Sequence, residues 1–327
     1  MPLKWRPKRG YVSIVLRCPA RPNRDLRMHI NRRAKIGLIV GATVLVAVVV
    51  AVLGISAVIT RHDNDPVSVL PFTDLKGPNG VAVGSTGEVY VADELGGQVR
   101  KLAPGSTTQV AIPFDIPSPE NPNGVGLDPV AIAVGPAGDI YVVDGHNDRV
   151  LKLAAGSTTP TVLPLADLAD PNGVAVDGSG NVYIAESHVR TPRVLKLPAD
   201  ATAPTVLPLT DVKFPKGVAV DGAGNVYVSD SGNNRILKLA NGSGAQSVLP
   251  FTGLNSPRGI AANKAGDVYV ADRGNSRVLK LAAGATSQEV VLSAGQYDPA
   301  GVAVDTAGNI YIADLHNHQV LKLAAHS

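Results

Sequence analysis

From Val67 to the end of the chain, short runs of apolar residues alternate with turns rich in Gly, Asp, Asn and Ser. The clearest copy of this pattern is 217–257, where Gly-Val-Ala-Val, Val-Tyr-Val, Leu-Lys-Leu and Val-Leu-Pro-Phe are separated by three turn sequences. Short runs of β-branched, aromatic and aliphatic residues bounded by such turns are typical of β-strands. The pattern therefore predicts a repeating unit of four short strands.

The unit occurs six times, with steps of 51, 42, 44, 42 and 42 residues between successive copies. The first strand of each copy opens at Gly80, Ala131, Gly173, Gly217, Gly259 and Gly301. Ten residues later each copy has a tyrosine, at Tyr90, Tyr141, Tyr183, Tyr227, Tyr269 and Tyr311. A period of about 40 to 45 residues with four strands in each repeat is typical of a β-propeller. We therefore predict an all-β fold, a six-bladed β-propeller over residues 67–327.

The two ends of the repeat region predict how the ring closes. The sixth copy stops after its third run, at Leu323, and has no fourth run of its own. The missing run stands before the first copy, as Val-Ser-Val-Leu-Pro-Phe at 67–72. Pairing this N-terminal strand with the last blade closes the ring and leaves no open edge between the first and last blades.

Three motifs recur across the copies: Pro-x-Gly-Val-Ala-Val-Asp, Gly-Asn-Val-Tyr-Val-x-Asp and Asn-x-Arg-Val-x-Lys-Leu. Together they resemble NHL repeats. The segments 248–254 (Val-Leu-Pro-Phe-Thr-Gly-Leu) and 272–277 (Asp-Arg-Gly-Asn-Ser-Arg) are most similar to the propeller of mycobacterial receptor serine/threonine kinases of the PknD type. In that family the propeller is an extracellular, membrane-tethered sensor domain, so the resemblance implies a sensing or binding role. The sequence departs from the family in one respect, because the kinase motifs Gly-x-Gly-x-x-Gly, His-Arg-Asp and Asp-Phe-Gly are absent from it.

Residues 36–59 form an uncharged stretch of 24 residues, of which 15 are Ile, Leu or Val. As a helix this stretch spans about 36 Å, enough to cross a hydrocarbon core of about 30 Å with some tilt. A buried helix of a soluble domain is a weaker interpretation, because the stretch is apolar on all sides and nothing else in the chain would cover it. A cleaved signal peptide is another alternative, but its apolar region is normally about 7 to 15 residues long. We predict a transmembrane signal-anchor helix.

Charge is divided unevenly along the chain, and this sets the expected orientation. Residues 1–35 carry eleven Lys or Arg and one acid, whereas residues 66–327 carry 18 Lys or Arg and 24 Asp or Glu. Because positively charged flanks stay in the cytoplasm, 1–35 is predicted to be a basic cytoplasmic tail and 60–66 a short linker to an extracytoplasmic propeller. The chain is thus expected to be a single-pass protein of the cell membrane.

The formal net charge of +3 hides a net charge of +10 in the tail and of −6 in the repeat region. A nucleic-acid-binding domain needs a basic surface on its folded part, so we predict no nucleic acid partner. The one cysteine, Cys18, lies in the tail, so the repeats must be held together by strand pairing and packing without a disulfide.

Variable positions on one face of the predicted propeller are the candidate ligand contacts. The loops between blades and the turns between second and third strands share this face, and the anchor should leave it pointing away from the membrane. Just before each opening residue stand Asn79, Val130, Asn172, Lys216, Arg258 and Ala300, which differ while their neighbours repeat. The second-to-third turns add His146, His188, His316 and His318. We predict that Asn79, Asn172, Lys216, Arg258 and these histidines contact an unknown protein, peptide or envelope ligand.

The histidines also suggest an alternative class of function. Propeller enzymes such as NHL-type amidating lyases and streptogramin lyases use histidines near the axis, and imidazole is a common ligand of zinc. Against this, the histidines replace Gly or Asn in turns, and His316 and His318 form the only close pair. We therefore predict no metal, no other cofactor and no catalytic residue, and keep a metal-dependent lyase or lactonase as the alternative.

One set of recurring carboxylates resembles fragments of a calcium loop: Asp177, Asp221 and Asp305. The equivalent residues in the other three copies are Gly84, Gly135 and Asn263. A turn explains all six copies and a calcium site explains three, so we interpret these residues as turn-forming.

A second set of carboxylates ends the second run of five copies: Asp93, Asp144, Asp230, Asp272 and Asp314. Three of them are followed five residues later by an arginine, at Arg149, Arg235 and Arg277, and Gln98 and Gln319 take this place in copies one and six. The spacing predicts ion pairs and turn hydrogen bonds that hold the second-to-third turn.

The sequence as a whole favours a membrane-anchored, extracytoplasmic binding or sensor module that is not an enzyme. An enzyme should show polar groups that converge on a bound ion at the channel mouth, whereas a binding module should show a broad surface with a shallow funnel. A purely structural scaffold is the third class that the sequence leaves open.

Overall fold

The computed structural model describes residues 11–17, 25–31, 67–114, 126–293 and 295–325. The chain divides into two compact units, Met1–Ile59 and Thr60–Ser327. In the first unit, strands β1 (Tyr11–Arg17) and β2 (Asp25–Asn31) pair antiparallel. This part of the chain was predicted only to be a basic tail, without strands. The strand β1 nevertheless agrees with the β-branched and aromatic residues in Tyr-Val-Ser-Ile-Val, which favour extended backbone.

The stretch predicted to be a transmembrane helix, 36–59, lies outside the described residues. Within the described residues, none of the helices has the length and hydrophobicity that a membrane crossing requires.

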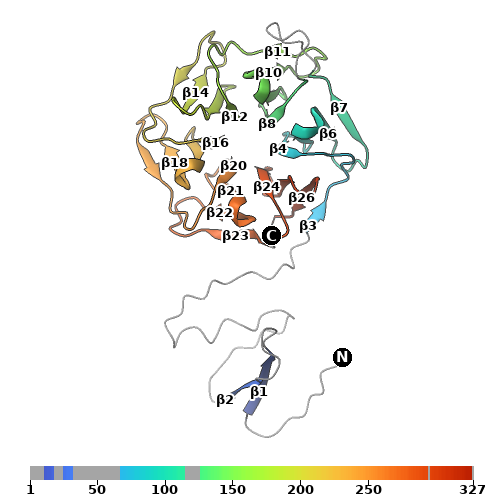
Figure 1. The fold of residues 1–327 in the computed structure, drawn as a ribbon, viewed down its shortest axis with the longest axis vertical. Helices are drawn as coiled ribbons and strands as arrows, with labels where there is room; N and C mark the ends of the chain where they lie inside the picture. Colours follow the sequence, from blue (N-terminus) through green and yellow to red (C-terminus); the bar gives the residue numbers. More distant parts are fainter. Residues whose placement is uncertain (1–10, 18–24, 32–66, 115–125, 294, 326–327) are drawn as a thin grey trace. The chain divides into compact units, whose positions relative to one another are not determined.

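The described residues between 67 and 325 form six four-stranded antiparallel sheets, arranged as blades around a central axis (Figure 1). The innermost strands are β4 (Pro78–Val83), β8 (Pro129–Val134), β12 (Pro171–Val176), β16 (Pro215–Val220), β20 (Pro257–Ala262) and β24 (Pro299–Val304). The second strands, all buried along their length, are β5 (Val89–Asp93), β9 (Ile140–Asp144), β13 (Val182–Glu186), β17 (Val226–Asp230), β21 (Val268–Asp272) and β25 (Ile310–Asp314). The six-bladed propeller predicted from the repeats is confirmed.

The third strands are β6 (Gln98–Leu102), β10 (Arg149–Leu153), β14 (Arg193–Leu197), β18 (Arg235–Leu239), β22 (Arg277–Leu281) and β26 (Gln319–Leu323). The outer strands are β7 (Gln109–Ile112), β11 (Thr161–Val162), β15 (Thr205–Val206), β19 (Gln246–Val248), β23 (Glu289–Ser293) and β3 (Val67–Val69). In blades 1, 2, 4 and 5 a short 3-10 helix joins the second and third strands: η2 (Glu94–Gly96), η3 (Gly145–Asn147), η4 (Ser231–Asn233) and η5 (Arg273–Asn275).

The last blade is completed by the N-terminal strand of the propeller. β3 pairs antiparallel with β26, with Val67 opposite Leu323 and Val69 opposite Leu321. The blade therefore has the order β24-β25-β26-β3, as the unattached fourth run at 67–72 predicted. Because the first and last strands of the ring share one sheet, blade 6 has no unpaired edge along β26.

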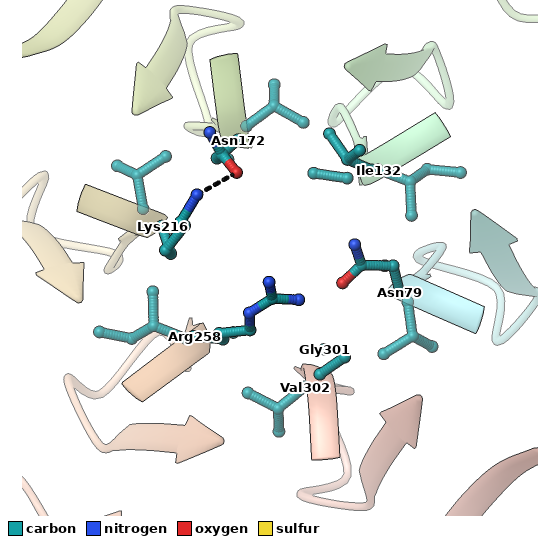
Figure 2. A pocket seen from close by; sticks show the side chains of 18 residues that line it. Asn79, Ile132, Asn172, Lys216, Arg258, Gly301 and Val302 are labelled. Carbon is teal, nitrogen blue, oxygen red and sulfur yellow. Dashed lines mark hydrogen bonds between the residues drawn. The ribbon is translucent and has the colours of Figure 1, made fainter. Parts of the chain in front are cut away.

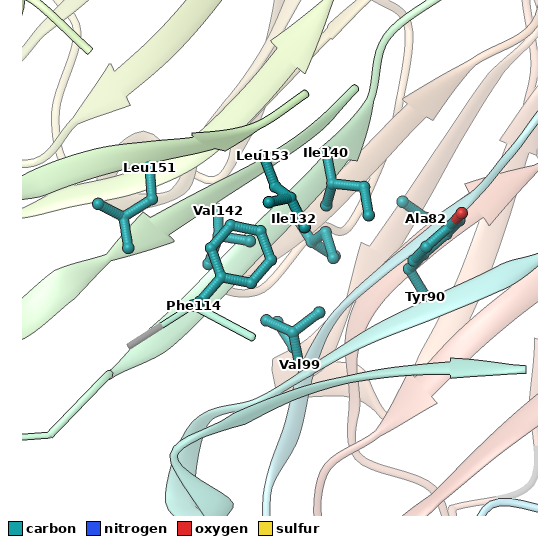
Figure 3. Close-up of a cluster of buried hydrophobic side chains, with 10 residues drawn as sticks. Ala82, Tyr90, Val99, Phe114, Ile132, Ile140, Val142, Leu151 and Leu153 are labelled. Carbon is teal, nitrogen blue, oxygen red and sulfur yellow. The ribbon is translucent and has the colours of Figure 1, made fainter. Parts of the chain in front are cut away.

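The hydrophobic core is divided into clusters that lie between neighbouring blades. Figure 3 shows the cluster between blades 1 and 2, where Tyr90 and Val99 pack with Ile140 and Leu151. Phe114, which follows the outer strand of blade 1, is only 2% exposed and belongs to the same cluster. Each blade thus uses both faces of its sheet, because side chains alternate between the two faces along a strand.

The six repeated tyrosines have a common environment that explains their spacing. Each lies opposite a lysine of the third strand, as Tyr90 lies opposite Lys101. The lysine Nζ lies between 5.4 and 5.7 Å from the centroid of the tyrosine ring in all six blades. This distance is suitable for a cation–π interaction, so the Tyr and the Leu-Lys-Leu motif stabilise each blade as a pair.

Candidate functional site

A small cavity of about 80 Å³ lies on the propeller axis, where the six inner strands begin (Figure 2). Three successive residues of each inner strand line it. The first of the three are the predicted variable positions: Asn79, Val130, Asn172, Lys216, Arg258 and Ala300. The next two, in every blade, are a Gly or Ala and then a Val or Ile. The structure therefore brings all six variable positions together around one axial pocket with an apolar wall.

The axial pocket opens on the face that the sequence analysis selected. The inner strand β4 begins at Pro78, opposite Asp93, where β5 ends and the turn to β6 starts. The other five inner strands have the same register with their second strands. Loops between blades and second-to-third turns therefore surround the pocket, and we call this side of the propeller the pocket face.

Hydrogen bonds fix three of the polar side chains at the pocket. Lys216 Nζ donates to Asn172 Oδ1 at 2.8 Å, and Figure 2 shows this bond across the mouth. Asn172 Nδ2 in turn donates to the backbone oxygen of Asp170 at 2.7 Å. On the other side, Asn79 Nδ2 donates to Glu94 Oε2 at 2.6 Å. The lysine ammonium is therefore hydrogen-bonded to an uncharged amide oxygen.

Arg258 extends into the centre of the pocket (Figure 2). Within the part of the chain that the structure describes, its guanidinium has no hydrogen bond and no carboxylate oxygen within 4.0 Å. The two nearby carboxylates are engaged elsewhere: Glu94 binds Asn79, and Asp298 forms a two-bonded pair with Arg273 at 2.6 and 2.9 Å. Lys216 and Arg258 are thus two half-buried cations without a directly bound counterion.

The surroundings of the pocket disfavour the charged forms of Lys216 and Arg258. Burial lowers the pKa of the Arg258 guanidinium from its usual value, and the neighbouring Arg273 lowers that pKa further. Burial is also the main reason why the pKa of Lys216 is lowered, and Arg258 adds to the effect. A charged group loses hydration when it is buried, so both side chains would gain from an anion bound in the pocket.

The four predicted histidines lie in second-to-third turns on the pocket face, but none of them lines the pocket. His146 Nδ1 lies 2.8 Å from Asp128 Oδ2, and the His146 side chain is 66% exposed. His188 Nδ1 lies 3.0 Å from Thr191 Oγ1. His318 closes the turn before β26 with a φ of 54°. In the described ranges, no group of three or more His, Cys, Asp or Glu residues is placed to hold a metal ion.

The recurring carboxylates at the ends of the second strands are structural, as predicted. The five aspartates are fully buried, and each accepts a backbone N–H at 2.7 to 3.0 Å from the loop before its blade: Gly77, Asp128, Lys213, Asn255 and Asp298. Three of them pair with the predicted arginines at 2.6 or 2.7 Å, and Gln319 Nε2 donates to Asp314 at 2.8 Å. In blade 1, Arg100 Nε lies 4.0 Å from Asp93 Oδ2.

Glu186 is the blade 3 member of this set, and the sequence comparison missed it. It is 1% exposed, accepts the backbone N–H of Ala169 at 3.1 Å and pairs with Arg193 at 2.6 Å. The arginine follows seven residues after Glu186 instead of five, because the β13–β14 turn is longer. The shared Leu-Lys-Leu motif after Arg193 was the signal that would have identified the pair.

Phe214 is a second residue that the sequence analysis did not select. It stands directly before the proline that opens β16, with a φ of 49°, and it is 38% exposed. At the equivalent position the other blades have Gly77, Asp128, Asp170, Ser256 and Asp298. Bulky residues rarely adopt a positive φ, so a phenylalanine here is not what the turn requires. Comparing the residue before each inner-strand proline would have revealed it.

A second exposed apolar side chain lies on the pocket face. Val189, in the β13–β14 turn, is 71% exposed. Ser187 joins this turn to the start of β16, because its Oγ donates to the backbone oxygen of Pro215 at 2.6 Å. Phe214 is two residues before Lys216 in the same segment. Phe214 and Val189 thus flank the Ser187–Pro215 contact, next to the segment that carries the pocket residue Lys216.

Comparison with known proteins gives a consistent picture of the fold. The NHL repeat family matches residues 213–239, 254–281 and 297–323. The serine/threonine-protein kinase PknD of Mycobacterium tuberculosis is 43% identical over 94 residues, which cover 26% of this chain and 14% of the kinase. The chain thus matches only about a seventh of the length of this curated relative.

Solved structures share the fold at low sequence identity. A gluconolactonase from Xanthomonas campestris superposes with a TM-score of 0.65 at 14% identity, covering 79% of this chain and 89% of the enzyme. A streptogramin B lyase structure gives 0.58 at 16% identity, with 80% and 98% covered, and a nidogen/laminin complex gives 0.57 at 18%, with 76% and 83% covered. At these identities the likeness concerns the fold alone. The second unit of the chain is therefore a six-bladed propeller of the NHL-repeat type that resembles part of PknD.

Proposed function

We propose that the propeller is a non-enzymatic binding or sensor module whose ligand contacts the pocket face. The observation that carries this proposal is the difference between the six blades at one position. The inner strands repeat their Gly and Val or Ile residues, which packing around the axis requires, but the residue at the mouth changes in every neighbouring blade. Because the fold does not require these changes, they are best explained by contact with a ligand.

The proposed contacts are Asn79, Asn172, Lys216 and Arg258 at the pocket, with His146, His188, His316 and His318 on the surrounding turns. In this proposal the described propeller supplies a rigid frame, and the ligand is a protein, peptide or other component of the cell envelope. The polar groups at the pocket are two amides and two cations, which suit recognition of a polar or anionic group.

The test is capture of a partner by the purified propeller from an envelope fraction of the source cells. We expect the Lys216→Ala, Arg258→Ala double variant to retain its melting temperature and to capture much less of the specific partner. Lys264→Ala is a matched control, because Lys264 is an exposed cation of the β20–β21 turn, on the side opposite the pocket face. Equal capture by the wild type and the double variant would remove the pocket from the proposed site.

We further propose that residues 36–59 anchor the chain in the cell membrane, with 1–35 cytoplasmic and 60–66 as the linker. The uncharged stretch of 24 residues and its basic N-terminal flank support this arrangement. Val67 pairs with Leu323, at the end of β26 away from the β25–β26 turn, so the linker reaches the propeller on the side opposite the pocket face. The pocket would then point away from the membrane.

Limited proteolysis of intact cells tests this orientation. We expect a protease added outside to cut loops of the pocket face first, since the opposite turns would lie close to the bilayer. Equal cutting on both sides, or protection of the whole propeller, would contradict the proposed arrangement.

The alternative function is a metal-dependent lyase or lactonase. It is supported by the fold shared with a streptogramin B lyase and a gluconolactonase and by the histidines on the pocket face. Elemental analysis of the purified, untagged chain distinguishes the two functions. About one equivalent of a divalent transition metal, lost in His146→Ala or His316→Ala, would replace the binding proposal with the enzymatic one.

A further inference from the structure

We propose that the pocket face binds an acidic peptide segment, whose carboxylate enters the axial pocket between Lys216 and Arg258 while an adjacent apolar side chain packs on Phe214 and Val189. This inference rests on the proposed function of the pocket face and specifies the chemistry of its ligand.

The first argument is the unbalanced positive charge in the pocket. Lys216 binds an amide oxygen, and Arg258 has neither a hydrogen bond nor an ion pair in the described part of the chain. Burying a cation without a counterion costs free energy, because the cation loses hydration. A carboxylate placed between two such cations offsets this cost by accepting charge-assisted hydrogen bonds from both. The planar guanidinium also matches the two oxygens of a carboxylate.

Five other arginines on the pocket face differ from Arg258, because each has a carboxylate partner. An acidic partner within 2.6 to 2.7 Å satisfies each of Arg149, Arg193, Arg235, Arg273 and Arg277. These pairs hold turns and connections, as the buried carboxylates require. Arg258, at the axis, does not hold a turn or a connection in this way.

The second argument is the size and wall of the pocket. Its volume of about 80 Å³ is well below the roughly 300 to 1,000 Å³ of sites that enclose a whole small molecule. Valine and isoleucine side chains from the six inner strands form the wall. Such a pocket accepts one small terminal group, so the remainder of the ligand has to lie on the surface around the mouth.

The third argument is the presence of two exposed apolar residues near the segment that carries Lys216. Phe214 keeps a strained backbone and an exposed ring where the other blades have Gly, Asp or Ser. Val189 lies on the adjoining turn, which Ser187 fixes to Pro215. Residues with a strained backbone conformation cluster at binding and active sites, where the strain is tolerated because the residue has a function. An acidic residue followed or preceded by an apolar one would satisfy both parts of this surface.

The experiment uses the propeller unit, residues 60–327, which closes its own ring through β3 and is compact by itself. A phage-displayed peptide library is selected on the wild-type unit and, in parallel, on the Lys216→Gln, Arg258→Gln double variant. We expect wild-type selection to enrich peptides with Asp or Glu beside an aromatic or aliphatic residue, and expect these peptides to disappear with the double variant. Enriched peptides without acids, or the same peptides on both proteins, would overturn the inference.

A synthetic copy of the most enriched peptide is then titrated calorimetrically. Arg258→Gln should weaken its binding by on the order of tenfold or more, since the partner carboxylate would be left half-paired. Phe214→Asn should also weaken binding and at the same time raise the melting temperature by about 2 to 4 °C, because asparagine tolerates the positive φ. Lys264→Gln, in the β20–β21 turn on the opposite face, is the control and should leave both quantities unchanged. A lower melting temperature in Phe214→Asn with unchanged binding would show that Phe214 is structural and contradict its proposed role.

Competition separates the peptide from other anions. Succinate or inorganic phosphate that binds wild type as tightly as the peptide would overturn the peptide assignment. If no peptide is enriched at all, the inference is wrong, whereas the broader binding function is still judged by envelope capture. If capture succeeds and is unaffected by Lys216 or Arg258 substitution, the proposal of a binding module is supported and the proposal of an acidic peptide ligand is contradicted.

Discussion

Each turn between the first and second strands carries one carboxylate, at one of two positions. In blades 3, 4 and 6 it is Asp177, Asp221 or Asp305, and it accepts the hydroxyl of the repeated tyrosine at 2.8 to 3.0 Å. In blades 1, 2 and 5 it stands four residues later, as Glu88, Asp139 or Asp267, and pairs with the third-strand lysine at 2.7 to 3.6 Å. The turn interpretation of Asp177, Asp221 and Asp305 is confirmed, since Oδ1 of each accepts the backbone N–H groups two and four residues later in its own turn.

Asp221 shows how strongly this turn holds its carboxylate. Burial raises the pKa of Asp221, but hydrogen bonds from Asn225, Tyr227 and the backbone outweigh it, so the pKa lies below its usual 3.8. The distances are 2.7 Å from Asn225 Nδ2 and 2.8 Å from Tyr227 Oη. Burial, with the Asp221 charge, also raises the pKa of Tyr227. The ionised acid and the neutral phenol therefore stabilise each other.

Replacing Asp221 with Asn should lower the free energy of unfolding by about 1 to 3 kcal/mol at pH 7, because a charged acceptor of buried hydrogen bonds is lost. Since the folded-state pKa is depressed, the carboxylate stabilises the fold above 3.8, and this contribution is lost as the pH falls through the folded-state pKa. The difference in stability between wild type and variant should therefore narrow below pH 4.

Urea denaturation of both proteins from pH 7 to pH 2.5 measures this difference. Asp200→Asn is the control, because Asp200 is exposed at the end of blade 3 and its replacement should have little effect. A difference that stays constant over the whole pH range would contradict the assigned role of the Asp221 charge.

The inner strands approach one another closely because glycine opens five of the six repeats. A Cβ atom on Gly217 would lie 2.6 Å from the backbone oxygen of Arg258 and 2.9 Å from Ser229 Oγ. A Cβ atom on Gly259 would lie 2.7 Å from the backbone oxygen of Ala300. Blade 2 has Ala131 at this position, so one methyl group is accommodated in the natural ring. The glycines thus keep the axial pocket narrow and hold Lys216 and Arg258 in adjacent strands close together.

Gly217→Ala should lower the free energy of unfolding by about 1 to 3 kcal/mol, the usual cost of overpacking, because backbone atoms of β20 cannot move aside freely. Thermal and urea unfolding of the propeller unit measure the effect. Gly178→Ala is a matched control, since a Cβ atom there meets nothing within 4 Å and its φ is not positive. Equal stability of Gly217→Ala and wild type would show that the inner strands can separate without loss.

The ring as a whole depends on a strand that is remote in sequence from the blade it completes. β3 pairs with β26, and the residues that follow it, Leu70 and Phe72, pack against the core cluster between blades 6 and 1. Without β3, the edge of β26 would be open to other chains, and these apolar contacts would be missing.

Deleting residues 60–72 should therefore destabilise the propeller by about 3 kcal/mol or more, from the loss of two packed apolar side chains and the strand pairing. It should also promote association through the exposed edge. Calorimetry and size-exclusion chromatography measure both effects. Deleting 60–66 alone is the control and should leave a stable monomer-sized ring, whereas a stable ring after removal of 60–72 would rule out the closing role of β3.

The six blades, the closing strand and the pocket face were predictable from the sequence, because strands of a propeller pair with neighbours in the chain and every blade repeats the same local pattern. The transmembrane helix at 36–59 stays a prediction, since it lies outside the described residues. The variable positions from Asn79 to Ala300 could be listed in advance, yet their meeting around one small pocket required the ring to be closed. Among the described residues, Arg258 has no hydrogen-bond or ion-pair partner and Lys216 binds an amide oxygen, and both facts depend on distances between blades. Those distances depend on how all six inner strands pack around the axis, and the sequence of a single repeat does not determine that packing.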